Sequence, residues 1–395
     1  MKSFPWWRLA VAGFLCAALS ARAGAEEAFH PEIGIHLLAR YSQRAEEGHW
    51  AGFLPAGHAH GSRRGLSFDH SELTIGAAFA PSWRAQASFA LKEGALVGEE
   101  AWLAARGADA GLAVKGGRFF AALGAHNEQH PHAWDFADQS LPHRAFIGEH
   151  YAQEGVQFAW RPLRFAGLEF VAGLGRGVHK EGRRDPVSRA WMARLGNEHA
   201  GGVTWRAGLS WLAVRADARP GHWEDDNGVE TELRFAGQSR LAVADFVWQW
   251  APEGEADDPR LKFQAEYLRR RESGTLACAD NAAFGGACSA GGIADHYRAR
   301  QSGWYAQGLY RFLPGWRLGF RHDRLVAGHV DFAPAFAGVL SPPASAPRRN
   351  TLLIEWGPDE SRRLRLQLAR EALGEAQAGH RVVLQYLHLL GSHAH

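Results

Sequence analysis

The sequence predicts an all-β protein, a transmembrane antiparallel β-barrel of about sixteen strands. Apolar and polar residues alternate with a period of two in many segments, as they do in strands with one apolar face. After the first 25 residues, no segment approaches the roughly 20 consecutive apolar residues of a membrane-spanning helix. The composition of the 395 residues, with 46 Gly, 16 Trp, 22 Phe and only 2 Met, also favours a barrel.

Residues 1–25 have the features of a signal peptide. Lys2 and Arg8 precede a short apolar stretch from Leu9 to Leu19, and two small-x-small cleavage candidates follow at positions 21–23 and 23–25. Such a segment directs export and is then removed. We therefore expect residues 26–395 to pass through the periplasm and to form a single barrel domain in a bacterial outer membrane.

Three segments show the alternation most clearly: residues 83–91, 261–268 and 364–368. In a barrel the apolar face contacts lipid and the polar face lines the lumen, whereas a soluble sandwich would bury the apolar face. Connection lengths favour the barrel. Short turns such as 313–315 alternate with long polar segments such as 124–150, and outer-membrane barrels alternate tight periplasmic turns with longer extracellular loops.

Under this rule the sixteen strands follow in order, and both termini are periplasmic. The predicted strands begin near residues 32, 65, 83, 99, 112, 151, 164, 189, 203, 239, 259, 298, 315, 349, 361 and 379. Residues 229–235 also alternate, but a separate strand there would make the count odd, so we place them in an extracellular excursion from 217 to 238. The first strand begins within about ten residues of the expected cleavage site, which leaves no room for a plug domain.

Two cysteines, Cys278 and Cys288, follow the signal segment and lie in one stretch rich in Gly, Ala and Ser. In an exported protein such a pair predicts a local disulfide. The chain has no Gly-x-Ser-x-Gly elbow and no His-Glu-x-x-His motif, so we expect no enzyme. Without a basic cluster or a phosphate-binding loop, it is also not expected to bind nucleic acid.

One block of sequence resembles a known family. Gly-Arg-Phe-Phe at 117–120, Asn-Glu-Gln-His-Pro-His-Ala-Trp-Asp-Phe at 127–136 and Arg-Ala-Phe at 144–146 resemble the signature of a proteobacterial family of porin-like outer-membrane proteins. Its members are also described as zinc-regulated outer-membrane receptors. Further similar segments lie at 244–248, 301–305 and 322–325. The resemblance implies an outer-membrane barrel and a connection with zinc.

The segment 124–150 is the candidate constriction of the pore. In wide barrels a long loop can fold inward, and the prolines and aromatic residues of this segment make it stiffer than a freely solvated loop. The residues expected at the constriction are Arg118, Glu128, Trp134, Asp135 and Arg144. The alternative for the charged residues is that they attach the folded loop to the barrel wall by salt bridges.

Histidine is the chemically unusual residue, with 21 copies. Neutral imidazole is a common zinc ligand, and His-x-His on an extended strand places both rings on one face. The expected metal ligands are His58, His60, His126, His130 and His132, with Glu128 and Asp135 as oxygen donors. The alternative is that these histidines are ordinary polar loop residues.

The leading hypothesis is therefore a passive porin-like channel for small hydrophilic solutes or ions, surrounded by lipid and lipopolysaccharide and needing no cofactor. Basic residues, among them Lys115, Arg118, Arg298 and Arg300, outnumber acidic ones on the expected lumen face, which favours anions. The runner-up is a zinc-binding or zinc-uptake receptor that uses His-rich extracellular loops, and a structural or adhesion barrel is the third. Fold analogy with general porins, which are often trimers, suggests a homo-oligomer.

Overall fold

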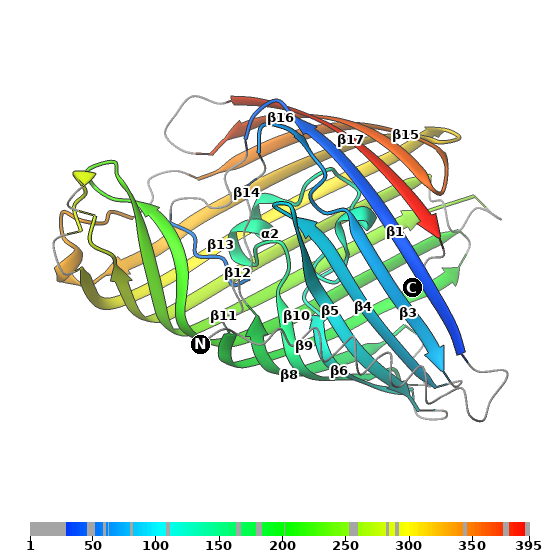
Figure 1. Ribbon diagram of the computed structural model, residues 1–395, viewed down its shortest axis with the longest axis horizontal. Helices are drawn as coiled ribbons and strands as arrows, with labels where there is room; N and C mark the ends of the chain where they lie inside the picture. The colour runs from blue at the N-terminus through cyan, green and yellow to red at the C-terminus, as the bar shows by residue number, and fades with distance from the viewer. Residues whose placement is uncertain are drawn as a thin grey trace.

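A computed structural model describes most of the chain as strands (Figure 1). The described residues are 29–45, 52–57, 61, 63–79, 82–107, 111–162, 167–178, 184–200, 202–252, 260–281, 284–288, 292–342, 346–373 and 379–391. The expected signal peptide, residues 1–25, lies outside them. None of the helices in the described part is long and apolar enough to cross a lipid bilayer.

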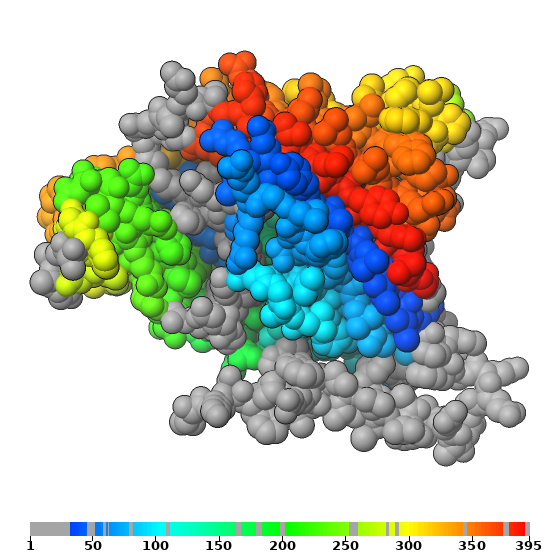
Figure 2. Space-filling view, turned by 45° about the horizontal axis from the view of Figure 1, so that its top comes forward, coloured from blue at the N-terminus to red at the C-terminus, as the bar shows by residue number. Residues whose placement is uncertain are grey.

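The strands form one antiparallel sheet that closes on itself. They are β1 (Phe29–Ser42), β2 (Gly65–Ser67), β3 (Glu72–Phe79), β4 (Trp83–Lys92), β5 (Ala95–Arg106), β6 (Leu112–Phe120), β7 (Ala152–Trp160), β8 (Glu169–Val178), β9 (Arg184–Ala200), β10 (Val203–Glu224), β11 (Glu230–Trp250), β12 (Leu261–Cys278), β13 (Ile293–Leu313), β14 (Trp316–Phe332), β15 (Arg348–Asp359), β16 (Arg362–Ala372) and β17 (Gly379–Gly391). β1 pairs with both β3 and β17, which closes the barrel. The blue β1 and the red β17 lie side by side in Figures 1 and 2.

The predicted count of sixteen strands is confirmed. Of the seventeen strands, β2 has only three residues and pairs with the loop end of β1, so the other sixteen carry the wall. The second wall strand begins at Glu72 rather than near residue 65. No plug domain lies within the described residues, as expected.

The predicted alternation of faces is also confirmed. In β12, Leu261, Phe263 and Tyr267 are exposed on the outside, whereas Gln264 and Glu266 are buried inside. The same order holds in β16, where the leucines at 364, 366 and 368 point outward and Arg365 and Gln367 point inward. The barrel therefore has an apolar outer belt suited to lipid.

One expected long loop, residues 217–238, is largely strand, and other strands extend further than expected. Residues 229–235, which we placed in an excursion, are almost entirely the first part of β11, and they pair with the end of β10. β12 continues to Cys278 and β14 to Phe332. The physical reason is a second apolar core on the inner side of these extensions, which includes Trp223, Phe235, Leu276 and Tyr297. A disulfide joins Cys278 and Cys288 at the connection between β12 and β13.

The connection between β6 and β7, residues 121–151, folds into the barrel, and we call it the inner loop. It carries the 3-10 turn η2 (Pro131–Ala133) and the helix α2 (Leu141–Phe146), which contacts β12, β13 and β14 (Figure 1). The Ser140 hydroxyl accepts a hydrogen bond from the His143 N–H and begins α2, with proline in its first turn. A long loop folded inward is what the sequence predicted.

The inner loop has an apolar side that packs on the wall. Its partners include Leu212, Val243, Leu268 and Leu325 of the surrounding strands. Residues 52–57 cover α2 from the other side, and the Ala56 and Gly57 N–H groups donate to the Phe146 and Ile147 carbonyls at 2.9 and 2.7 Å. The lumen face is therefore apolar at this level, and the expectation of a polar lining holds only away from this packing.

Candidate functional site

Arginines from four consecutive strands hold one side of the inner loop. We call Arg321 (β14), Arg349 (β15), Arg365 (β16) and Arg381 (β17) the arginine cluster, and all four are buried. Arg321 donates to Asp138 Oδ1 at 2.6 Å, Arg349 to Asp138 Oδ2 at 3.0 Å, and Arg381 also pairs with Asp138 Oδ2. Charge-assisted hydrogen bonds of this kind are the stronger ones in proteins.

The loop backbone is bound by the same cluster. Arg365 donates to the Trp134 carbonyl at 2.6 Å, and Arg321 donates to the Asp138 carbonyl at 2.8 Å. Burial alone would raise the pKa of Asp138, but the nearby guanidiniums of Arg349, Arg321 and Arg381 hold it well below its usual 3.8. Asp138 is therefore ionised wherever the loop is docked at neutral pH.

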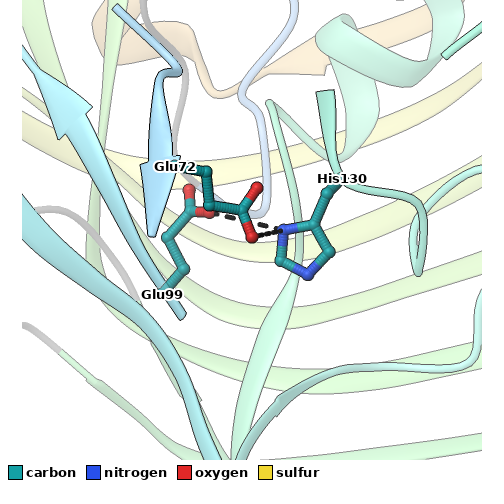
Figure 3. Close-up of side chains that lie close together, drawn as sticks. All are labelled: Glu72, Glu99 and His130. Atoms are coloured by element: carbon teal, nitrogen blue, oxygen red, sulfur yellow. Dashed lines mark ion pairs between the residues drawn. The ribbon is translucent and has the colours of Figure 1, made fainter. Parts of the chain in front are cut away.

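The opposite wall meets the inner loop through acidic residues, which we call the carboxylate cluster: Glu72, Glu99 and Glu100 around His130. The Nδ1 atom of His130 lies 3.1 Å from Glu72 Oε1 and 3.6 Å from Glu99 Oε2, and its Nε2 atom lies 3.0 Å from Glu100 Oε2. Figure 3 shows Glu72 and Glu99 turned from the wall toward the imidazole ring. His132 lies beside them, with its Nδ1 3.2 Å from Glu72 Oε2.

A β-bulge brings two successive carboxylates to the same face. Ser88 of β4 pairs with Glu100 and Phe89 pairs with Gly98, so Glu99 is the extra residue of β5. Successive side chains of a regular strand point to opposite faces, and a bulge breaks this rule. Both carboxylates are consequently buried on the lumen side, each 7 % exposed.

The histidines of the inner loop differ in charge. Burial alone would lower the pKa of His130, but Glu72 together with Glu100 and Glu99 raises it well above 6.5. Burial lowers the pKa of His143 to about 3 and that of His150 to about 4. Burial lowers the pKa of His132 also. Near neutral pH, therefore, His130 is charged and the other three are neutral.

Two cavities lie between the inner loop and the strands from β3 to β9. The first, of about 420 Å³, is lined by Glu72, Glu100, His130 and His132 among others. The second, of about 990 Å³, reaches the strand ends near the short turns. Trp102, Lys115 and Glu128 line both, which joins the carboxylate cluster to the larger space.

The residues predicted for the constriction do not form one group. Glu128 lines both cavities and faces Arg194 at 3.6 Å. Asp135 binds Lys262 of the wall at 2.8 Å, and the Trp134 ring N–H donates to the Gln129 carbonyl at 2.8 Å. Arg144 is buried in α2. Asp135 therefore follows the alternative given above: its salt bridge attaches the folded loop to the barrel wall.

The placement of Arg118 at the constriction was wrong. Arg118 pairs with Glu154 at 2.7 Å, and Glu154 shares a strand face with Val156 and Phe158, which are exposed on the outside. Lys115 of the same strand points into the lumen. Because residues three positions apart in a strand point to opposite faces, Arg118 points outward. Arg298 and Arg300, also expected in the lumen, are likewise exposed.

The predicted metal ligands separate into three sets. His58 and His60 lie outside the described residues. His126 is buried between Trp134 and His143, with ring centroids 5.3 and 4.8 Å away. His130 and His132 meet carboxylates, though these are Glu72, Glu99 and Glu100 of the wall and not Glu128 or Asp135. They lie in the lumen and not on an external surface.

Sequence reasoning missed Asp138, Glu99 and Glu100. One signal for Asp138 was present: arginine stands at an inward position in each of the last four strands, so an acidic partner was to be expected in the lumen. Nothing in the period-two pattern marks Glu99, because its orientation depends on the bulge.

Comparisons with known proteins support the fold. No family model matches the chain. An uncharacterized protein of Aquifex aeolicus (strain VF5) is 28 % identical over 333 residues, which cover 80 % of this chain and 66 % of that protein. The zinc-regulated part of the family resemblance gains no support from these comparisons.

Solved structures of outer-membrane proteins have a similar fold. The outer membrane channel DcaP of Acinetobacter baumannii is 9 % identical, with a TM-score of 0.55 over 93 % of this chain and 99 % of that one. The trimer form of OmpT from Vibrio cholerae is 10 % identical, with a TM-score of 0.52 over 92 % and 100 %. An anion-selective porin from Comamonas acidovorans is 8 % identical, with a TM-score of 0.50 over 92 % and 100 %. The closed barrel and its apolar belt place this chain in an outer membrane.

Proposed function

We propose that this protein is an outer-membrane channel for small hydrophilic solutes, narrowed by the inner loop. The observation that carries the proposal is the position of residues 121–151 inside a closed barrel, fixed to β14–β17 by the arginine cluster. A loop held in this way reduces the cross-section of the lumen and leaves the two cavities along β3–β9 as the solute path.

The charges along this path favour anions at one level and cations at another. The larger cavity is lined by more basic than acidic side chains, namely Arg84, Arg106, Lys115, Arg161 and Arg194 against Glu128 and Glu169. The smaller one is lined by Glu72, Glu100 and Glu128 against Lys115. Rings of one charge sign select the opposite ion, so we propose a weak anion preference set at the larger cavity. The names of two compared proteins, a channel and an anion-selective porin, agree with this proposal.

The test is conductance in planar lipid bilayers. Purified full-length protein that shows heat-modifiable migration in detergent gels should produce discrete current steps, and the heat-denatured sample should produce none. Folded protein that inserts into bilayers and conducts no ions would refute the channel. A homo-oligomer, by analogy with the trimer form of OmpT, is measured in the same preparation by its mass in detergent.

A zinc-uptake receptor is the second candidate. The observation that favours it is the pair His130 and His132 beside wall carboxylates. Because this pair lies in the lumen, capture would occur inside the barrel. The sequence suggested capture by His-rich extracellular loops instead. If that hypothesis holds, replacing His58 and His60 by Ala should lower zinc uptake by whole cells. Unchanged uptake would refute capture by these loops.

A further inference from the structure

The carboxylate cluster has the donor set of a metal site. One oxygen each from Glu72 and Glu99 and one ring nitrogen of His130 lie within 4.8 Å of one another (Figure 3). Two ligands that bind zinc tetrahedrally at 2.0–2.1 Å are about 3.4 Å apart. The distances from His130 Nδ1 to the two carboxylates, 3.1 and 3.6 Å, lie on either side of this value.

Two candidate ligand atoms of this group, Glu99 Oε2 and His130 Nδ1, are buried without a hydrogen-bond partner among the described residues. Glu99 binds Lys92 through Oε1 at 2.9 Å, whereas its Oε2 atom is buried without a hydrogen-bond partner among the described residues and points toward His130. A buried carboxylate oxygen without a hydrogen bond is costly. The bulge that turns Glu99 inward creates this cost, and a bound cation would remove it.

The charge around the cluster is also unbalanced. Glu72, Glu99 and Glu100 surround His130 at 3.0 to 3.6 Å. Lys92 pairs with Glu99 Oε1 at 2.9 Å. Carboxylates therefore outnumber basic side chains in these contacts. The arginine cluster, by contrast, surrounds its carboxylate with guanidiniums.

A cation could reach this position from the lumen. Glu72 and His130 both line the cavity of about 420 Å³, which continues past Lys115 and Glu128 into the larger one. Three protein ligands with a fourth position open to solvent form a known class of zinc site. Glu100 and His132 flank the three and could orient them, as outer-sphere partners do in metal sites.

We propose that Glu72, Glu99 and His130 form a binding site for a divalent transition-metal cation, which ties the inner loop to β3 and β5. The ion takes the place of the proton on His130 Nδ1, and this proton leaves to solvent, because a ligating imidazole nitrogen must be deprotonated. Zinc capture inside the barrel, the second candidate function, would require this site. Metal binding at the site does not depend on whether the barrel conducts ions.

Zinc titration by calorimetry tests the proposal. Full-length protein without an affinity tag, stripped with chelator and kept in detergent, is titrated with Zn²⁺ in two buffers that differ in ionisation enthalpy. One ion should bind per chain with release of about one proton. Glu99→Gln and His130→Gln should each weaken binding at least about tenfold, since even changes to outer-sphere partners cost 10 to 100-fold.

Glu128→Gln is the matched control, because Glu128 lines the same cavity outside the three ligands. It should bind Zn²⁺ as the unchanged protein does, and all variants should keep heat-modifiable migration. The proposal is overturned if the folded protein binds no Zn²⁺, if Glu99→Gln binds it as tightly as the unchanged protein, or if Glu128→Gln loses as much affinity. Since the assay uses no bilayer, these results would leave the channel proposal standing.

Discussion

The inner loop is held at two places with opposite designs. At the arginine cluster, one loop carboxylate, Asp138, is surrounded by wall guanidiniums. At the carboxylate cluster, one loop imidazole, His130, is surrounded by wall carboxylates, and a cavity adjoins it. Both contacts bury charged groups. Guanidiniums enclose the Asp138 carboxylate, whereas the carboxylate cluster is open to a cavity on one side.

This difference distinguishes an attachment point from a binding site. A buried ion pair stabilises a fold only where geometry and further hydrogen bonds offset the loss of hydration. Asp138 meets that condition, because arginines of four wall strands bind the loop segment around it. At the carboxylate cluster, one buried oxygen, Glu99 Oε2, has no hydrogen bond among the described residues, and the cluster is open to the lumen. We expect this arrangement of a site that accepts a cation.

The largest effect is expected from Asp138→Asn. This change removes the loop carboxylate from guanidiniums that also pair with Asp323 and Glu371 of the wall, and removal of one partner from a buried pair costs about 3–5 kcal/mol. The loop should leave the wall while the barrel persists, so single-channel conductance should rise and fluctuate. Asp226→Asn, at an exposed position, is the control. Equal conductance in the two variants would show that the arginine cluster does not hold the constriction.

An intermediate effect is expected from pH, with opposite signs for two histidines of the inner loop, His150 and His130. His150 has a pKa of about 4 when docked against 6.5 when free, so the released loop binds more protons between these values. Docking therefore weakens as the pH falls from 6.5 to 4, by about 3 kcal/mol at about 1.4 kcal/mol per pKa unit. The raised pKa of His130 acts in the other direction: its contribution is complete below pH 6.5 and is lost as the pH rises through the raised value.

Conductance should accordingly be lowest near neutral pH and rise toward pH 4. His150→Asn removes one titrating group, leaving His143, and can still donate to the Asn127 carbonyl, which His150 Nδ1 contacts at 3.0 Å. This variant should have a flatter acid limb. If its acid limb matches that of the unchanged protein, His150 is not the group that releases the loop.

The smallest effect concerns ion selectivity. Lys115 lines both cavities, with its Nζ 5.0 Å from the Trp102 ring. Lys115→Gln should shift the reversal potential in a KCl gradient toward cation preference, because the negative charges of the carboxylate cluster then act with less opposition. Arg298→Gln, which changes an exposed residue, should leave the potential unchanged. A shift of the same size in both would assign selectivity to the overall charge and not to the path.

Much of the fold could be predicted because its signals are local. Alternation within 261–268 and 364–368 assigned lipid and lumen faces correctly, and the requirement for an even number of strands excluded 229–235 as a separate one. Prolines and aromatic residues within 124–150 indicated a loop that folds inward. Each of these depends on residues close together in the chain.

Only the tertiary structure decided what the loop touches. Asp138 meets arginines 183 to 243 residues further along the chain, and no local pattern specifies that distance. Glu99 faces the lumen because of a one-residue bulge, and Arg118 faces outward because faces alternate; a shift of one residue reverses such an assignment. The sequence by itself therefore determined a closed barrel with an inner loop, since periodicity and composition suffice for that. The two charge clusters were decided by register and by contacts between distant strands.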